Sequence, residues 1–351
     1  MKNGSQPKKR YFAAANSADG FVNYFPFIFG AAPCRRLFVI RGGPGTGKSS
    51  FMRRVADAAE NAGIEVTYYH CSSDAESLDG LFLEGTGIGF VDGTAPHPWE
   101  PTFPGAFEET VDLGRFWRAE LLAMRRDEIE KLVREKKQGY ARAYGYLSAF
   151  GATHRAMEDR LREAVDGEKL RRAAERLLAS CNVPCGAFSE SIGLCDSFGM
   201  AGRVRFDTYE TSCARHVFVG DTAGMGHLFL GALYEACRRR GVSVRVSRAP
   251  LLPERVDALA LTDAGISFSL RENGEDERAV NMERFLSRRA LGAARAVRRA
   301  CEAACDHLLS LATEELARVR DRHFALESIY GGAMDFGAKE RFEETFLPRL
   351  L

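Results

Sequence analysis

The chain alternates short apolar runs with longer segments in which apolar residues recur every three or four positions. The runs at 35–40 and 65–70 are rich in β-branched and aromatic residues, which favour strands. The intervening segment, 49–62, has helical spacing, and Gly63 follows it where glycine commonly ends a helix. Strands that alternate with a helix of this length predict an α/β fold with a three-layer, mostly parallel sheet.

Three other stretches extend this pattern along the chain. The opening segment, 11–22, predicts a strand, a turn and a second strand that extend the central sheet. Residues 113–180 have helical spacing and abundant Arg, Glu, Ala and Leu, so they predict a helical arm that glycines interrupt. Residues 182–202 contain Pro184 and several glycines, which indicates a connection between two domains.

One segment fits the phosphate-binding pattern GxxxxGK[ST] at every specified position. It lies between the predicted strand 35–40 and the predicted helix 49–62, which is the order that this motif requires. Its glycines allow the backbone to approach a polyphosphate, whose charge is also favoured at a helix N-terminus. The residues expected to bind the nucleotide are Gly42, Gly43, Pro44, Gly45, Thr46, Gly47, Lys48, Ser49 and Ser50.

Side chains in and near this motif supply the expected chemistry. Lys48 brings a positive charge to the phosphates, and the hydroxyl of Ser49 is a ligand for Mg²⁺. Asp92 ends the apolar run 87–92 and is expected to hold the same Mg²⁺, directly or through a water. Asp74 or Thr94 is expected to orient an attacking water. The sequence therefore predicts a site for ATP and Mg²⁺.

The second half of the chain repeats the first half in order. The first loop, residues 42–49, corresponds to a second loop, residues 220–227, in which His227 follows Lys48 by 179 positions. The other matches are 256–259 with 78–81 and 265–268 with 87–90, both 178 positions apart, and the HxxxE pair His323 and Glu327 with His154 and Glu158, 169 positions apart. Three blocks in one order with nearly equal offsets indicate a duplication.

The repeat distinguishes residues with a chemical role from residues that maintain the fold, because the groups expected to act on the nucleotide are lost together in the second half. The replacements are His227 for Lys48, Leu228 for Ser49, Leu270 for Asp92 and Leu252 for Asp74. The HxxxE pairs and the aspartates at 79 and 257 persist in both halves, so we interpret them as structural. Spacing of i, i+4 puts His and Glu on one helix face, where an ion pair is commoner than a metal site.

The GGPGTGKS loop, the HCSSD and VDGTAPH segments and the duplicated layout resemble an uncharacterised bacterial family of tandem P-loop ATP-binding proteins. The resemblance covers nearly the whole chain and implies two P-loop NTPase-like domains, of which the first binds ATP. We expect an intact domain with its arm at 1–181, the connection at 182–202, and a degenerate domain with its arm at 203–351. The altered second loop departs from an intact tandem pattern.

Composition and charge bear on the partners and the location of the protein. A net charge of +1 and the lack of a long apolar run indicate neither a nucleic-acid partner nor a membrane, and the cytoplasm is the expected location. Nine cysteines without CxxC pairs argue against a disulfide framework. The partner is an unknown protein or small molecule.

Three functions remain open on the sequence. The leading hypothesis is a Mg²⁺-dependent ATPase whose arms report the nucleotide state; the lack of an NKxD motif favours adenine over guanine. A small-molecule or nucleotide kinase would use Asp74 as a base and arginines of the arm, such as Arg125, Arg126 or Arg134, over the donor. A nucleotide-sensing scaffold would bind ATP without turnover. Gly93 follows Asp92 where many ATPases have a glutamate, so hydrolysis is expected to be slow or to need a partner.

Overall fold

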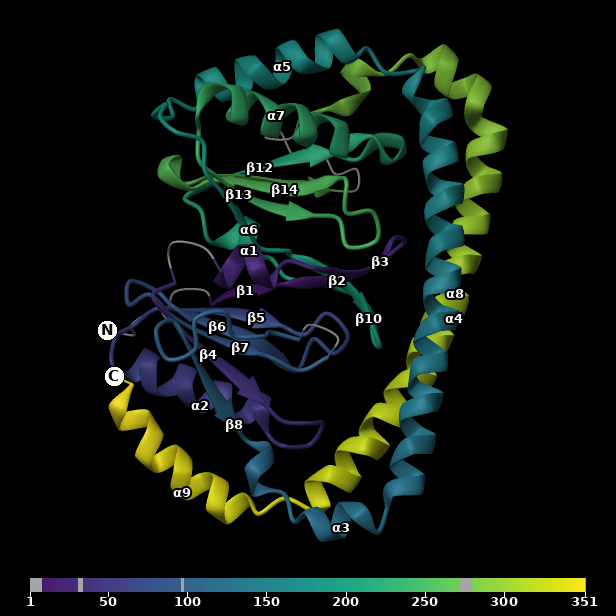
Figure 1. The fold of residues 1–351 in the computed structure, drawn as a ribbon. Coiled ribbons are helices and arrows are strands. Elements are labelled where there is room, and N and C mark those ends of the chain that lie inside the picture. The colour runs from purple at the N-terminus through teal and green to yellow at the C-terminus, as the bar shows by residue number, and fades with distance from the viewer. Residues whose placement is uncertain (1–7, 31–33, 96–97, 272–279, 351) are drawn as a thin grey trace, which may run out of the picture.

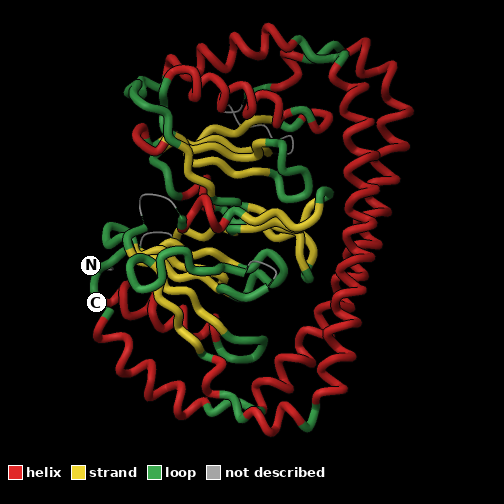
Figure 2. The backbone as a smooth tube through the Cα atoms, viewed as in Figure 1, coloured by secondary structure: helices red, strands yellow, loops and turns green. Residues whose placement is uncertain are grey.

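The structure is a computed structural model that describes residues 8–30, 34–95, 98–271 and 280–350. Pro96 and His97 of the VDGTAPH segment therefore lie outside the described residues. Two sheets are stacked, and a pair of long helices runs along one side of both (Figure 1). Figure 2 shows the strands gathered in the two layers and the helices around them. No helix in the described part of the chain is long and apolar enough to cross a membrane.

The first sheet has the strand order β1-β5-β6-β7-β4-β8. Its strands are β1 (Lys9–Phe12), β4 (Arg36–Arg41), β5 (Val66–His70), β6 (Leu78–Leu83), β7 (Ile88–Asp92) and β8 (Glu108–Asp112). The pairs β1-β5, β4-β7 and β4-β8 are parallel, whereas β6 runs antiparallel to both β5 and β7. Among the described residues the sheet is therefore mixed: three of its five pairs are parallel, as expected for most of the sheet, and β6 alone runs opposite to the other strands because a tight turn joins it to β7.

The second sheet repeats this topology with the order β12-β15-β14-β13-β9. Its strands are β9 (Glu190–Ile192), β12 (Arg215–Gly220), β13 (Val244–Arg248), β14 (Val256–Leu261) and β15 (Ile266–Arg271). Each pair has the same direction as its counterpart, and Val280 bridges Val219 in the place that β8 has in the first sheet. The segment expected to connect the halves, 182–202, therefore supplies an edge strand of this sheet.

Two hairpins lie between the sheets. They are β2 (Ala14–Ser17) with β3 (Gly20–Asn23), and β10 (Asp196–Gly199) with β11 (Gly202–Arg205). Of the opening segment only β1 joins the central sheet, so the expectation that its second strand does so is wrong. The amide of Asn16 donates to the carbonyl of Phe198 at 2.8 Å, which links the hairpins. One buried core with Tyr11, Cys195 and Ala258 then joins the two halves.

The two long helices are α4 (Arg126–Arg162) and α8 (Arg288–Gly332). Their ion pairs Arg142–Glu315 and Arg322–Glu135 show that they run antiparallel. A Cβ on Gly139 would lie 2.6 Å from Cγ2 of Val319, so the glycine lets the helices approach closely. Glycines thus leave α4 continuous, contrary to the interruption expected from the sequence.

The remaining helices are shorter. They are α1 (Phe25–Phe29), α2 (Lys48–Asn61), α3 (Ala119–Ala123), α5 (Gly167–Ser180), α6 (Thr208–Thr211), α7 (Gly226–Arg240) and α9 (Phe336–Phe346). We call α4 with α5 the first arm, and α8 with α9 the second arm.

Each arm ends on the sheet of the other half (Figure 1). Helix α5 packs on α7 and buries Leu170 in the core that contains Leu233. Helix α9 packs on α2, where the ring of Phe346 lies 5.5 Å from that of Phe51. The packed units therefore do not follow the residue ranges 1–181 and 203–351, because the two halves exchange their last helices.

Candidate functional site

The first loop joins β4 to α2 and wraps around a cavity of about 660 Å³ that all of the residues 42–49 line. Gly45 and Gly47 have φ values of 70° and 77°, which side chains rarely tolerate. Thr46 is buried, and its hydroxyl donates to the carbonyl of Gly43 at 2.9 Å. These glycines let the chain curl back over the N-terminus of α2, so that the loop backbone forms the wall of the cavity.

Lys48 extends back along the loop that precedes it. Its Nζ donates to the carbonyls of Gly42 at 3.0 Å and Gly43 at 2.9 Å. The same atom lies 3.5 Å from Oδ2 of Asp92, and both side chains are nearly buried. The ammonium group is therefore held on the cavity wall, with a carboxylate beside it.

Asp92 ends β7, next to β4 in the sheet. Its Oδ1 accepts from the backbone N–H of Thr94 at 2.9 Å and from the Thr94 hydroxyl at 2.6 Å. The turn after the strand thus orients the carboxylate toward Lys48. Thr94 lines the cavity, and its hydroxyl serves Asp92 in this arrangement.

Of the other expected site residues, Ser49 and Asp74 line the cavity and Ser50 does not. Ser49 lines the cavity, and its hydroxyl oxygen accepts from the N–H of Leu78 at 3.1 Å. Asp74 also lines it, with Oδ2 accepting from the Ser77 hydroxyl at 2.7 Å and Oδ1 from the Glu76 N–H at 3.2 Å. Ser50 is not among the lining residues; its hydroxyl donates to the carbonyl of Gly47 at 2.8 Å.

The arms complete the wall of this cavity, which the sequence did not predict. Lys136 and Tyr140 of α4 line it together with His323 and Glu327 of α8. A Cβ on Gly45 would lie 2.4 Å from the carbonyl oxygen of Glu327, so the loop and α8 are in direct contact. The second HxxxE pair therefore belongs to the first site, although its own half carries the altered loop.

The charged groups on the arms form a short chain. Nζ of Lys136 lies 3.1 Å from Nδ1 of His323, and Nε2 of His323 lies 3.5 Å from Oε1 of Glu327. Burial and the neighbouring Lys136 lower the pKa of His323 to about 4, so the imidazole is neutral at pH 7 and Nδ1 accepts from the ammonium. Burial and the nearby Asp74 raise the pKa of Glu327.

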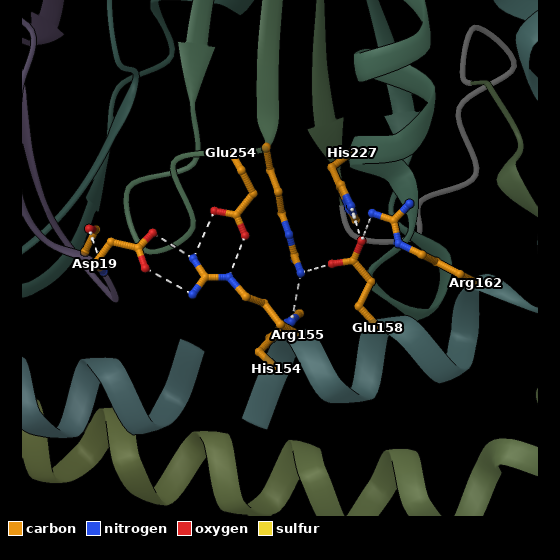
Figure 3. Close-up of polar contacts among 9 residues, drawn as sticks. Asp19, His154, Arg155, Glu158, Arg162, His227 and Glu254 are labelled. Carbon is orange, nitrogen blue, oxygen red and sulfur yellow. Dashed lines mark hydrogen bonds and ion pairs between the residues drawn. The ribbon is translucent and has the colours of Figure 1, made fainter. Parts of the chain in front are cut away.

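In the second loop, the residue at the position of Lys48 contacts the first arm (Figure 3). Oε1 of Glu158, on α4, lies 3.0 Å from Nε2 of His227 and 2.6 Å from Nη2 of Arg162. Its other oxygen accepts from Arg255. Nδ1 of His227 faces the carbonyl of Gly224 at 3.0 Å. Both ring nitrogens of His227 thus lie within hydrogen-bonding distance of an oxygen, one on Glu158 and one on the second loop.

Ion pairs near Glu158 also attach the first arm to the first hairpin and to the second half. Arg155 of α4 donates to Asp19 at 2.8 Å and to Glu254 at 2.9 Å, and so bridges the first hairpin and the second half (Figure 3). Lining groups of the adjacent cavity, about 560 Å³, balance four arginines against four acids: Arg155, Arg162, Arg248, Arg255, Glu158, Asp159, Glu235 and Glu254. This balance gives a highly charged anion little net attraction.

Comparison of the chain with known protein families, with curated proteins and with solved structures finds no match. The described residues also contain no group of three or more His, Cys, Asp or Glu side chains placed to hold a metal ion. The function has therefore to be argued from the geometry of the first loop and its surroundings.

Proposed function

We propose that the first half binds ATP with Mg²⁺ at the first loop and hydrolyses it, and that the arms respond to the nucleotide. The observation that carries this proposal is the shared cavity: all residues of the loop line it, with Lys48 3.5 Å from Asp92. A loop with this sequence and with glycines at positive φ presents its backbone to the phosphates of a nucleotide.

The donor set near Lys48 suits Mg²⁺. The Ser49 hydroxyl and the Asp92 carboxylate line the same cavity, and both are oxygen donors of the kind that Mg²⁺ prefers. Mg²⁺ usually shares its coordination with substrate phosphates and waters, so two protein groups are sufficient. When bound, the ion would neutralise charge on the phosphates. Lys48 would exchange its two carbonyl contacts for phosphate oxygens.

The contact between the first loop and α8 supports coupling to the arms. Gly45 lies close to the backbone of Glu327. Phosphates bound in the loop would therefore alter the packing of the loop on α8. The other end of the arm pair is fixed by Glu158 and Arg155. A helix pair that is fixed at one end and touches the nucleotide site at the other can report which nucleotide is bound.

Calorimetric titration with ATP and Mg²⁺ tests the binding step. The wild-type protein is expected to bind, and Lys48→Ala is expected to lose most of the affinity. Circular dichroism checks that the variant is folded, since the substitution also removes one partner of the nearly buried Asp92. Unchanged affinity in this variant would refute the proposal. Phosphate release without an added acceptor identifies an ATPase; release of ADP only with an acceptor identifies a kinase, and tight binding with neither identifies a scaffold.

A further inference from the structure

The strand that carries Asp92 supplies no second carboxylate to the cavity, because Gly93 follows Asp92. The helices of the arms do supply one. We infer that Glu327 is the base that accepts a proton from the attacking water, and that Lys136, held by His323, neutralises charge on the transferred phosphoryl group. This inference rests on the proposed function and names the groups that would carry out its hydrolytic step.

The surroundings of Glu327 support its role. Its backbone is packed on Gly45, at the tip of the first loop, and the residue lines the cavity. Among the described residues, three further acids besides Asp92 line the cavity. Both oxygens of Asp74 are engaged by Ser77 and by the backbone of Glu76. Oδ1 of Asp112 accepts from the N–H of Gly114, and Asp79 is buried. Burial raises the pKa of Glu327 and so strengthens it as a proton acceptor.

Lys136 is suited to neutralise phosphate charge. Lys136 is half-buried at the cavity wall, and burial lowers its pKa. The neutral ring of His323 orients this ammonium group without cancelling its charge. A phosphoryl group between Lys48 and Lys136 would meet positive charge from the loop and from the arm, and such preorganised charge is the main source of catalysis in phosphoryl transfer.

The chemical step is balanced by groups of the cavity and the substrate. The water oxygen forms a bond to the γ-phosphorus, and the bond from that phosphorus to the bridging oxygen breaks. The electron pair of the broken bond leaves with ADP. The proton of the water passes to the carboxylate of Glu327 and from there to solvent. His323 is a positioning residue in this step, since it acts through Lys136.

The first test compares Glu327→Gln with Glu302→Gln. Glu302 lies on the same helix in an exposed ion pair with Arg298, at 3.0 Å, so its variant controls for loss of a carboxylate on α8. Both variants are expected to bind ATP with wild-type affinity and to keep their melting temperature. Glu327→Gln is expected to lower kcat by ~10² or more, which is the usual contribution of a general base, and Glu302→Gln to leave it unchanged.

The second test separates positioning from folding at His323. In His323→Leu the contact to Lys136 is lost, and kcat is expected to fall as it does in Lys136→Met, with little change in the affinity for ATP. In His323→Gln the side-chain oxygen can accept from Lys136, so most of kcat is expected to return. Equal losses in both His323 variants would overturn the positioning role.

The outcomes distinguish this inference from the proposed function. If the wild-type protein hydrolyses ATP and Glu327→Gln does so at the same rate, the inference is wrong and the function stands. If the wild-type protein binds no ATP, or binds it and releases no phosphate, the proposed hydrolysis fails and the inference falls with it. A Glu327→Gln variant that is unstable would be replaced by Glu327→Asp, whose displaced carboxylate is expected to keep the fold and reduce kcat.

Discussion

The carboxylate of Glu158 lies 3.0 Å from Nε2 of His227, the residue that occupies in the second loop the position of Lys48 in the first. The contact joins the first arm to the second half beside the buried ion pair of Glu158 with Arg255. The equivalent residue of the second arm, Glu327, reaches the first loop and lines its cavity. The two equivalent residues thus differ in their partners, since Glu158 is paired with cations and Glu327 lies beside a loop of the phosphate-binding pattern.

Replacing Glu158 with Gln is expected to destabilise the protein. The variant removes the buried carboxylate that pairs with Arg255 and contacts His227, and breaking a buried ion pair typically costs about 3 kcal/mol. Denaturant unfolding measures the loss. Glu168→Gln, in an exposed ion pair of α5, is the control and is expected to change stability little. A Glu158→Gln variant as stable as the control would show that the buried pair does not stabilise the protein.

The same carboxylate predicts a loss of stability in acid. Burial alone would raise the pKa of Glu158, but the hydrogen bond from His227 and the charges of Arg255 and Arg162 lower it to about 2. A depressed carboxyl pKa stabilises the fold above the unfolded value, near 4.5, and that contribution disappears as the pH falls toward 2. Unfolding free energies measured from pH 5 to pH 2 should fall less steeply in Glu158→Gln than in the wild type.

One nucleotide is expected to bind to each chain. The second loop has Leu228 and Leu270 where the first site has Ser49 and Asp92, and Glu158 already pairs with His227. Calorimetry with a slowly hydrolysed ATP analogue gives the stoichiometry. A value near two that falls to one in Lys48→Ala would show that the second loop also binds nucleotide.

Asp92→Asn is expected to weaken Mg²⁺-dependent turnover more than Mg²⁺-free nucleotide binding. The carboxylate is held by Thr94 and is proposed to act on the metal, and loss of a group near a metal commonly costs ~10- to 100-fold in metal affinity or activity. Titrations of turnover against Mg²⁺ measure the first quantity, and calorimetry in chelator the second. Equal losses in both would identify Asp92 as a structural residue.

Gly45→Ala tests the contact between the first loop and α8. Gly45 and Gly85 have similar φ values, 70° and 76°, so alanine is strained by about 1 to 2 kcal/mol at either position. Only at Gly45 would the added Cβ also meet the carbonyl of Glu327. Gly45→Ala is therefore expected to destabilise the protein more than Gly85→Ala, and to reduce ATP binding. Equal effects of the two variants would argue against close packing of the loop on the helix.

The local parts of the first site were predictable, because they follow from neighbouring residues. The strand before the loop, the helix after it and the strand that ends at Asp92 lie within a residue of their expected positions. The spacing of the glycines also identified which residues form the loop. The antiparallel direction of β6 was not predictable, because a buried apolar run has the same composition in either direction.

The contribution of the arms could not be predicted for a different reason. The helical spacing of an arm shows that it has an apolar face, but not which surface that face covers. Glu327 follows Lys48 by 279 positions, and nothing in its HxxxE pair indicates that α8 returns to the first loop. Persistence of the pair in both halves suggested a purely structural role, which fits the buried Glu158 better than Glu327 at the cavity.

Because the two halves exchange their last helices, the order of translation determines when the core of each half can be covered. Helix α5 is translated before the strands of the sheet that it covers, whereas α9, which covers Phe51 of α2, is translated after the strands of both sheets. The first half must therefore wait, with this apolar face exposed, until α9 has been made. Nascent chains halted before residue 336 are expected to be cut by protease within the first half, and chains that include α9 to resist. A polypeptide without α9 would then leave the core beside the first loop uncovered.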